Sequence, residues 1–177
     1  MASIQKKKAT RSFILALLLL LVQLQVFSQT DRTAKINNLY KCLLEYKIEC
    51  PKTVLAIIVF ETGWLECKNC SYQYNNLFGF RTNQEYIRFK SVYACLDYFK
   101  IWEQTYYDTW KIKHPKGTYY EYLTHVKYAH VNIAHYIRTI KSIEKLVAEN
   151  TSVIDASLRQ EPGFLQDVPQ DTIPRKK

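Results

Sequence analysis

The centre of the chain reads Pro51-Lys-Thr-Val-Leu-Ala-Ile-Ile-Val-Phe-Glu-Thr-Gly-Trp64, an apolar run that ends on a carboxylic acid. Proline suits the first position of a helix, because the N–H that it lacks would be unpaired there in any case. The residues from Val54 to Phe60 are apolar on nearly every side of such a helix, which is typical of a helix at the centre of a domain. The sequence therefore predicts a core helix over Pro51 to Glu66.

Glu61 is the unusual residue of this helix. At 100° per residue its face also carries the apolar side chains Val54, Ile57, Ile58, Trp64 and Leu65. Burying a carboxylate without a partner is costly, and two interpretations are open. Glu61 is either a structural acid, paired with an arginine, a tyrosine hydroxyl or backbone amides, or a functional acid. In the second case desolvation keeps it protonated near neutral pH, ready to donate a proton.

A second motif follows at Asn75-Asn-Leu-Phe-Gly-Phe80. Its two amides suit hydroxyl and acetamido groups, Phe78 and Phe80 would supply apolar walls, and Gly79 lets a backbone approach closely. An Asn-Asn pair before apolar residues is also typical of an ordinary turn that leads into a strand. The position of the motif after the acid-bearing helix favours a carbohydrate site.

The chain resembles the peptidoglycan N-acetylglucosaminidases of glycoside hydrolase family 73 over about residues 33 to 147. The matching features, in the family's order, are these two motifs, the segment Tyr86 to Ser91, and Tyr128-Ala129 followed by Tyr136. The resemblance implies an α+β fold that is predominantly α, a lysozyme-like helical domain with one short β-hairpin beside the active-site cleft. It also implies an enzyme that cleaves the β-1,4 bond between N-acetylglucosamine and N-acetylmuramic acid, with Glu61 as the general acid.

The same resemblance implies which side chains meet the glycan strand, namely Trp64, Asn75, Asn76, Phe80, Tyr128 and Tyr136. The chain departs from the family at the second acid, which other members often carry in a longer hairpin. Here only Glu85 occupies the short segment from Thr82 to Glu85. Glu85 is either a second catalytic residue or a solvated turn residue, and both interpretations stay open.

The mechanism depends on that second acid. A carboxyl group about 6.5 to 9.5 Å from Glu61 would activate water for inversion, and one about 5 Å away would act as a nucleophile. Without one, the substrate's acetamido group would assist, or Glu61 alone would run a reaction like that of a lytic transglycosylase. The alternative from a different class is a non-catalytic peptidoglycan-binding module that keeps the groove and lacks the second acid.

The first 28 residues are typical of a signal peptide. Four basic residues between Lys6 and Arg11 precede an unbroken apolar run over Phe13 to Val22, and Ser28 offers a cleavage position. Ten apolar residues are short for a membrane span, so an uncleaved anchor is the alternative. We expect an exported protein of the periplasm or the cell exterior.

Residues 1–28 hold four of the 25 basic residues and none of the 16 acidic residues, which leaves 21 basic residues in the exported part. This mild excess favours approach to an anionic cell wall. No basic run interleaved with aromatic residues, the usual mark of a nucleic-acid surface, occurs there. We expect a monomer that binds peptidoglycan glycan strands, with no nucleic acid and no stable membrane insertion after cleavage.

Five cysteines are present, at positions 42, 50, 67, 70 and 95. An exported chain is expected to form disulfides between some of its cysteines. The predicted disulfide joins Cys67 and Cys70 in the loop after the acid-bearing helix. Cys42 with Cys50 is a second candidate pair, which leaves Cys95 as a buried apolar residue. Neither the cysteines nor the histidines have the spacing of metal ligands, so we expect no metal and no cofactor.

Patterning predicts the rest of the domain, residues 29–150. A helix over Asp31 to Tyr46 comes first, and a hairpin over Leu77 to Phe89 with its turn at Thr82-Asn-Gln follows the acid. Ser91 caps a long helix whose core-facing stripe is Val92, Cys95, Leu96, Phe99, Trp102 and Tyr106. His114-Pro-Lys-Gly117 breaks the chain before two further helices, over Tyr119 to Val126 and around Ile133 to Ile143. Residues 151–177 are predicted to be an extended or disordered tail.

Overall fold

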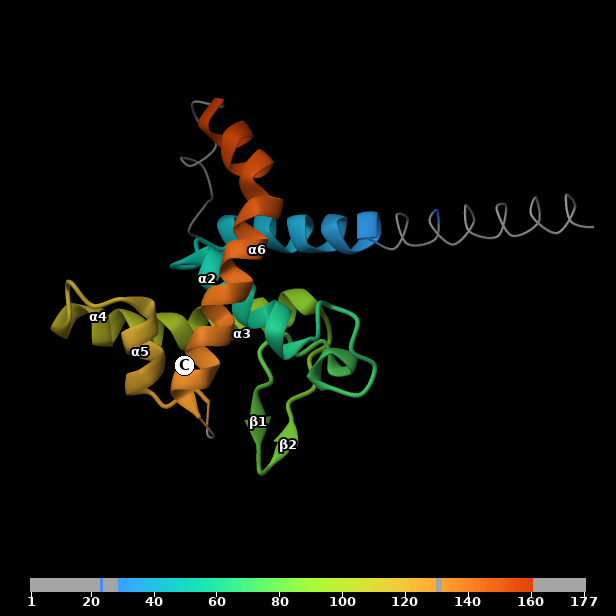
Figure 1. Cartoon of the computed structure of the whole chain (residues 1–177). Helices are drawn as coiled ribbons and strands as arrows, with labels where there is room; N and C mark the ends of the chain where they lie inside the picture. Colours follow the sequence, from blue (N-terminus) through green and yellow to red (C-terminus); the bar gives the residue numbers. More distant parts are fainter. Residues whose placement is uncertain (1–22, 24–28, 130–131, 161–177) are drawn as a thin grey trace, which may run out of the picture.

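The computed structural model describes residue 23, residues 29–129 and residues 132–160 (Figure 1). Within these ranges the chain is mostly helical, with one two-stranded antiparallel hairpin. The expected class, α+β and predominantly α, is confirmed. The predicted signal peptide lies outside the described residues except for residue 23. None of the described helices is long and apolar enough to cross a membrane.

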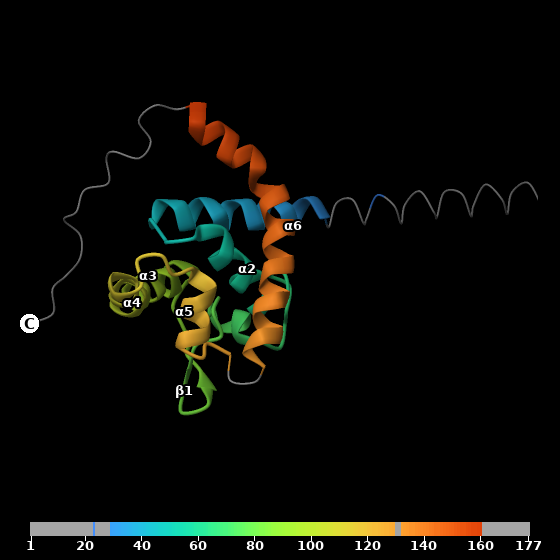
Figure 2. The ribbon, with the colours of Figure 1, turned by 60° about the vertical axis from the view of Figure 1, so that its left-hand side comes forward.

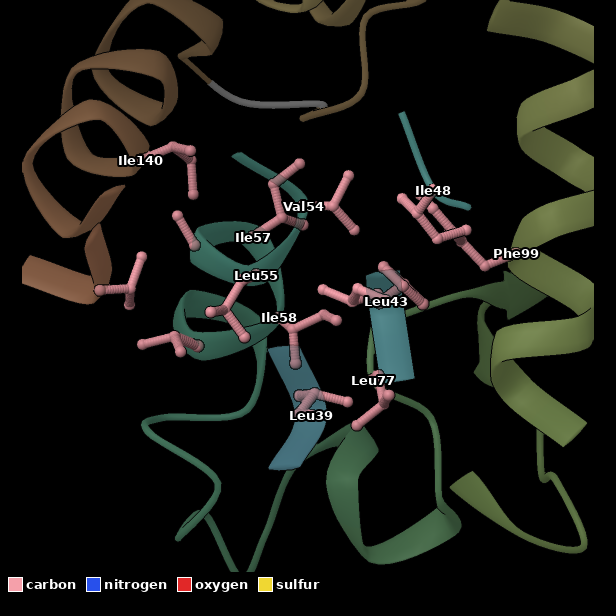
Figure 3. Close-up of a cluster of buried hydrophobic side chains, with 14 of the residues drawn as sticks. Leu39, Leu43, Ile48, Val54, Leu55, Ile57, Ile58, Leu77, Phe99 and Ile140 are labelled. Atoms are coloured by element: carbon pink, nitrogen blue, oxygen red, sulfur yellow. The ribbon is translucent and has the colours of Figure 1, made fainter. Parts of the chain in front are cut away.

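The helix over residues 29–45, α2 (Pro51–Glu61) and α6 (Ile133–Gln160) build the core. Every residue of α2 from Thr53 to Val59 is buried, as its all-round apolar sequence predicts. α6 packs along α2 and crosses the helix over residues 29–45 (Figures 1 and 2). The side chains that meet in this core come from all parts of the domain (Figure 3); among them are Leu39, Leu43, Val54, Ile58, Leu77, Phe99 and Ile140.

α2 ends five residues earlier than predicted, at Glu61. The backbone then turns left-handed at three consecutive residues, with φ values of 53° at Gly63, 63° at Trp64 and 63° at Leu65. Such a conformation costs a non-glycine residue about 1–2 kcal/mol. Thr62 stabilises the turn, because its hydroxyl donates to the Ile58 carbonyl at 2.6 Å and accepts from the Leu65 N–H at 3.1 Å. Glu61 is therefore the last residue of the helix, beside a loop.

The hairpin is short, as predicted, and stands away from the helices (Figure 1). A 3-10 helix, η1 (Ser71–Tyr74), precedes it, and β1 (Arg81–Thr82) pairs with β2 (Glu85–Tyr86). The turn residues Asn83 and Gln84 both have positive φ, the conformation of a two-residue hairpin turn.

α3 (Val92–Glu103) begins at Ser91, whose hydroxyl accepts from the Ala94 N–H at 3.1 Å as predicted. It continues through a π-helical turn, η2 (Gln104–Asp108), into α4 (Thr109–Lys113). The predicted stripe is buried at Cys95, Leu96 and Phe99, whereas Tyr106 is 53% exposed and Tyr107 only 3% exposed. A π turn contains more residues than an α turn, so it shifts the inward face of the helix by about one position. The prediction that Tyr106 belongs to the core was wrong.

α5 (Tyr119–His125) follows the predicted break and begins with a capping box between Thr118 and Glu121. α6 then runs ten residues beyond the predicted domain boundary at residue 150. Its extension is anchored, because Ile154 is buried and Asp155 accepts from the Tyr40 hydroxyl at 2.9 Å. The prediction of an extended tail was therefore wrong for residues 151–160, and residues 161–177 lie outside the described part.

All five cysteines are free thiols in the structure. The Cys70 thiol donates to the Cys67 carbonyl at 3.6 Å. Neither the predicted Cys67–Cys70 disulfide nor the candidate Cys42–Cys50 pair is present. Cys95 is fully buried, as predicted, and its sulfur accepts from the Leu77 N–H at 3.4 Å.

Candidate active site

Glu61 joins three parts of the molecule. Its carboxyl group is partly buried at the end of α2, and Oε1 accepts a hydrogen bond from the Tyr136 hydroxyl of α6 at 3.0 Å. Oε2 faces the backbone of Gly79, which precedes the hairpin. The exposed Phe60 packs edge-on against Tyr136, with ring centroids 5.3 Å apart. The acid is thus held between α2, α6 and the base of the hairpin.

Glycine is required at position 79 for two reasons. Its φ of 67° is in the left-handed region, and a Cβ added there would lie 2.9 Å from Oε2 of Glu61. The sequence predicts that Gly79 lets a backbone approach closely, and this is confirmed. The group approached is the carboxyl group of Glu61 itself.

Burial raises the pKa of Glu61 above the ordinary carboxyl value. The hydrogen bond from Tyr136 and the positive charge of Arg81 both lower this pKa, because they favour the ionised form, but burial is the larger effect. Among the described residues, no second carboxylate contributes to the shift. Glu61 therefore keeps its proton to a higher pH than a solvated glutamate does, as a proton donor must.

Glu85 is exposed near the tip of the hairpin, where it pairs with Thr82. Neighbouring residues of a strand point to opposite faces, so Glu85 lies on the other face from Arg81 and Tyr86. The Arg81 guanidinium stacks over the Tyr86 ring at 4.0 Å, and its charge acts on Glu61. Arg81 is thus the charged hairpin residue that perturbs the acid.

Asn75 and Asn76 hold the hairpin in place. Asn76 is fully buried; its Nδ2 donates to the carbonyls of Phe80 at 2.8 Å and Ile87 at 3.0 Å, and its Oδ1 accepts from the Phe80 N–H at 3.0 Å. The backbone of Asn75 is in the left-handed conformation, and its Nδ2 donates to the Phe89 carbonyl at 3.0 Å. The Asn76 amide has no exposed surface for a sugar, so its sequence-based assignment as a sugar contact is replaced by a structural role.

The predicted aromatic residues lie in one connected group, apart from Trp64. The Tyr128 ring is 5.9 Å from the Tyr136 ring, and its hydroxyl donates to the Phe78 carbonyl at 3.3 Å. Phe80 packs 5.4 Å from Phe78. Trp64 is partly buried against the core, on the left-handed turn that follows Glu61.

Three residues escape the sequence patterns. Arg81 comes near the acid only through the tertiary structure. Phe60 directly precedes Glu61 in the chain, but only the structure shows that its ring is exposed and packs against Tyr136. Glu103, the last residue of α3, is a second buried acid, with 0% exposure. Its spacing from Leu96 and Phe99 places it on the core-facing stripe of the helix, and this signal would have found it.

Within the described ranges, no group of three or more histidine, cysteine, aspartate or glutamate side chains is arranged to hold a metal ion. Three surface hollows lie away from Glu61. One is lined by Thr33 and Asn37, one by Cys42 and Tyr93, and one by Trp110 and His114. A tyrosine hydroxyl, the positive charge of Arg81 and aromatic rings surround the Glu61 carboxyl group, an arrangement that suits proton transfer.

No protein-family model matches the chain, and comparisons with curated proteins and with solved structures give no match.

Proposed function

We propose that the protein is an exported cell-wall glycosidase with a lysozyme-like fold. Its substrate is the β-1,4 bond between N-acetylglucosamine and N-acetylmuramic acid in peptidoglycan, and Glu61 is the general acid. The observation that carries the proposal is the carboxyl group of Glu61, which has a raised pKa and remains partly exposed at the end of a buried helix. The motif resemblance supplies the substrate class.

In the proposed reaction, Glu61 protonates the glycosidic oxygen. The bond from that oxygen to the anomeric carbon breaks, its electron pair stays on the oxygen, and positive charge develops on the sugar ring. Oε1 already accepts from Tyr136, so Oε2 is the oxygen that carries the proton. Oε2 has room only because Gly79, which it faces, carries no side chain. Tyr136 and Arg81 stabilise the carboxylate that remains.

The step that follows depends on what attacks the sugar cation. Since no second carboxylate perturbs Glu61 within the described residues, we favour attack by the substrate's own acetamido group, or by a hydroxyl group that Glu61 deprotonates. The first route ends in hydrolysis and a reducing end, and the second ends in an anhydro sugar. A catalytic role for Glu85 stays a proposal of lower rank, because Glu85 lies on the hairpin face opposite Arg81.

Digestion of purified peptidoglycan followed by mass spectrometry of the fragment ends tests the proposal. The wild-type protein should release fragments with new reducing N-acetylglucosamine ends, and Glu61→Gln should release none while keeping the wild-type melting curve. Anhydro ends would assign the transglycosylase route. Fragments released equally by both proteins would overturn the role of Glu61.

The second candidate is a non-catalytic peptidoglycan-binding module. It is favoured because, among the described residues, no second carboxylate perturbs the pKa of Glu61. It predicts that the protein sediments with peptidoglycan and creates no new ends, and that Glu61→Gln leaves this binding unchanged. The same digestion, combined with a sedimentation assay, separates the two candidates.

A further inference from the structure

Four aromatic side chains form a row beside α3, which we name the aromatic ledge: Phe80, Tyr98, Trp102 and Tyr106. The ring centroids of Phe80 and Tyr98 are 5.1 Å apart, those of Phe80 and Trp102 6.2 Å, and those of Trp102 and Tyr106 5.7 Å. Residues 98, 102 and 106 recur every four positions, which places them on one side of the helix.

The ledge is open to solvent along its length. Tyr98 is 43% exposed and Tyr106 is 53% exposed, and Phe80 and Trp102 are partly exposed. Single exposed aromatic residues are common on protein surfaces, whereas a contiguous exposed row marks an interaction surface. The π turn contributes to this row, because it presents Tyr106 outward and buries Tyr107 in its place.

The ledge is continuous with the acid. The Trp102 ring lies 6.1 Å from the Tyr128 ring, which lies 5.9 Å from the Tyr136 ring. The Tyr136 hydroxyl in turn donates to Glu61. This series of ring contacts runs inside the protein, because Tyr136 is buried. The ledge itself begins next to the acid, since Phe80 follows Gly79, the residue that Oε2 of Glu61 faces.

A glycan strand matches this surface. A sugar ring has an apolar face of C–H groups that packs on an aromatic ring, and polar edges that stay in water. Tyrosine and tryptophan combine an apolar ring with a polar group in the same way. Around the ledge, Asp97, Gln104 and Thr105 are exposed polar residues, which suit a hydrated polymer better than an apolar protein partner.

We infer that the aromatic ledge binds the glycan strand beyond the bond that Glu61 attacks, by stacking Tyr98, Trp102 and Tyr106 against successive sugar rings. This inference rests on the proposed function and extends it: the protein should prefer long glycan strands to short ones. A disaccharide at Glu61 is too short to extend along the ledge, whereas a longer chain also contacts it.

The test uses the double variant Tyr98→Ala/Tyr106→Ala, built in the Glu61→Gln protein so that no probe is cleaved. Both residues are about half exposed and neither belongs to the buried core, so their removal should leave the fold intact. Tyr93→Ala is the matched control, because Tyr93 is a 60% exposed tyrosine of the same helix that adjoins Cys42 and Leu65 at a separate hollow. The probes are a peptide-free disaccharide and a peptide-free hexasaccharide of peptidoglycan, and calorimetry measures their dissociation constants.

The double variant should bind the hexasaccharide at least about fivefold more weakly than its parent, which is the effect expected for two lost ring contacts. Its affinity for the disaccharide and both affinities of the Tyr93→Ala control should stay unchanged. Equal hexasaccharide affinity in the double variant and its parent would overturn the inference, and so would an equal loss in the control.

Failure of the inference is distinguishable from failure of the proposed function. If the wild-type protein creates new glycan ends but the ledge variants keep full hexasaccharide affinity, only the inference fails. If the hexasaccharide binds through the ledge and no new ends appear with the wild-type protein, the proposed glycosidase activity fails and the inference stands.

Discussion

Glu61 and Glu103 are two acids with raised pKa values in different surroundings. In both, burial is the main cause of the shift, and it raises the pKa of Glu103 to about 7. Glu103 is sealed inside the protein; its Oε2 accepts from Lys100 and from the Glu49 N–H, each at 3.2 Å. Glu61 is partly exposed and accepts from a tyrosine.

The difference shows that a raised pKa does not by itself identify a catalytic acid. Oε1 of Glu103 and the hydroxyls of Tyr119 and Tyr122 have no hydrogen-bond partner among the described residues, and all three atoms are buried. A substrate has no access to Glu103. Access, as well as desolvation, separates a proton donor from a structural acid.

The largest expected effect is the contrast in activity between Glu61→Gln and Glu103→Gln. Loss of a general acid typically lowers the rate by about 10²–10⁴-fold, so Glu61→Gln should be close to inactive on peptidoglycan. Glu103→Gln should stay within about threefold of wild type. The rate of appearance of new reducing ends measures both, and similar losses in the two variants would contradict the contrast.

The second effect is on stability and concerns Glu103. Its pKa is raised from 4.5 in the unfolded chain to about 7 in the folded protein. The protonated form of Glu103 therefore adds to the free energy of unfolding in full below pH 4.5, and this contribution is lost as pH rises through about 7. The shift corresponds to about 3 kcal/mol between these limits. Urea unfolding should therefore show wild type losing stability relative to Glu103→Gln between pH 5 and pH 8. If the free energies of unfolding of the two proteins changed with pH in parallel, Glu103 would not titrate in this range.

The third effect compares two glycines. Gly79→Ala should cost about 1–2 kcal/mol of stability through its positive φ, and it should lower activity more than tenfold, because the new Cβ displaces the Glu61 carboxyl group. Gly63→Ala is the control, since Gly63 also has a positive φ but its added Cβ would meet Cys67. Thermal melts and activity assays on both variants should show similar destabilisation and a larger activity loss for Gly79→Ala. Equal activity losses in the two variants would show that general destabilisation, and not displacement of Glu61, causes the effect.

The smallest effect is expected for Tyr136→Phe. The phenylalanine keeps the packing against Phe60 and Tyr128 and removes the hydrogen bond that lowers the pKa of Glu61. The pKa of Glu61 should therefore rise further, because the ionised form loses this hydrogen bond. Activity that needs protonated Glu61 falls as pH rises through this pKa, so the fall should move to higher pH in the variant. A shift to lower pH would contradict the role of Tyr136.

Local chemistry predicted most of the helices and the hairpin. The apolar run after Pro51, the cap at Ser91 and the break at His114 all act within a few residues, so a sequence pattern captures them. The errors occurred where a local turn interrupts the regular helical repeat. The left-handed turn after Glu61 depends on the Thr62 hydroxyl, which donates to Ile58 and accepts from Leu65. The π turn at residues 104–108 changes the register of an otherwise regular stripe.

The sequence by itself determined that a buried helix carries a carboxylic acid, because hydrophobic periodicity and the position of Glu61 are properties of one segment. The tertiary structure alone decided which groups surround that acid. Tyr136, Gly79 and Arg81 come from other segments, and only folding brings the hydroxyl of α6, the backbone before the hairpin and the charge of β1 near Glu61. The sequence also could not reveal the partners of Asn76, because folding brings the Phe80 and Ile87 carbonyls to its amide. Its amide was therefore expected to bind a sugar.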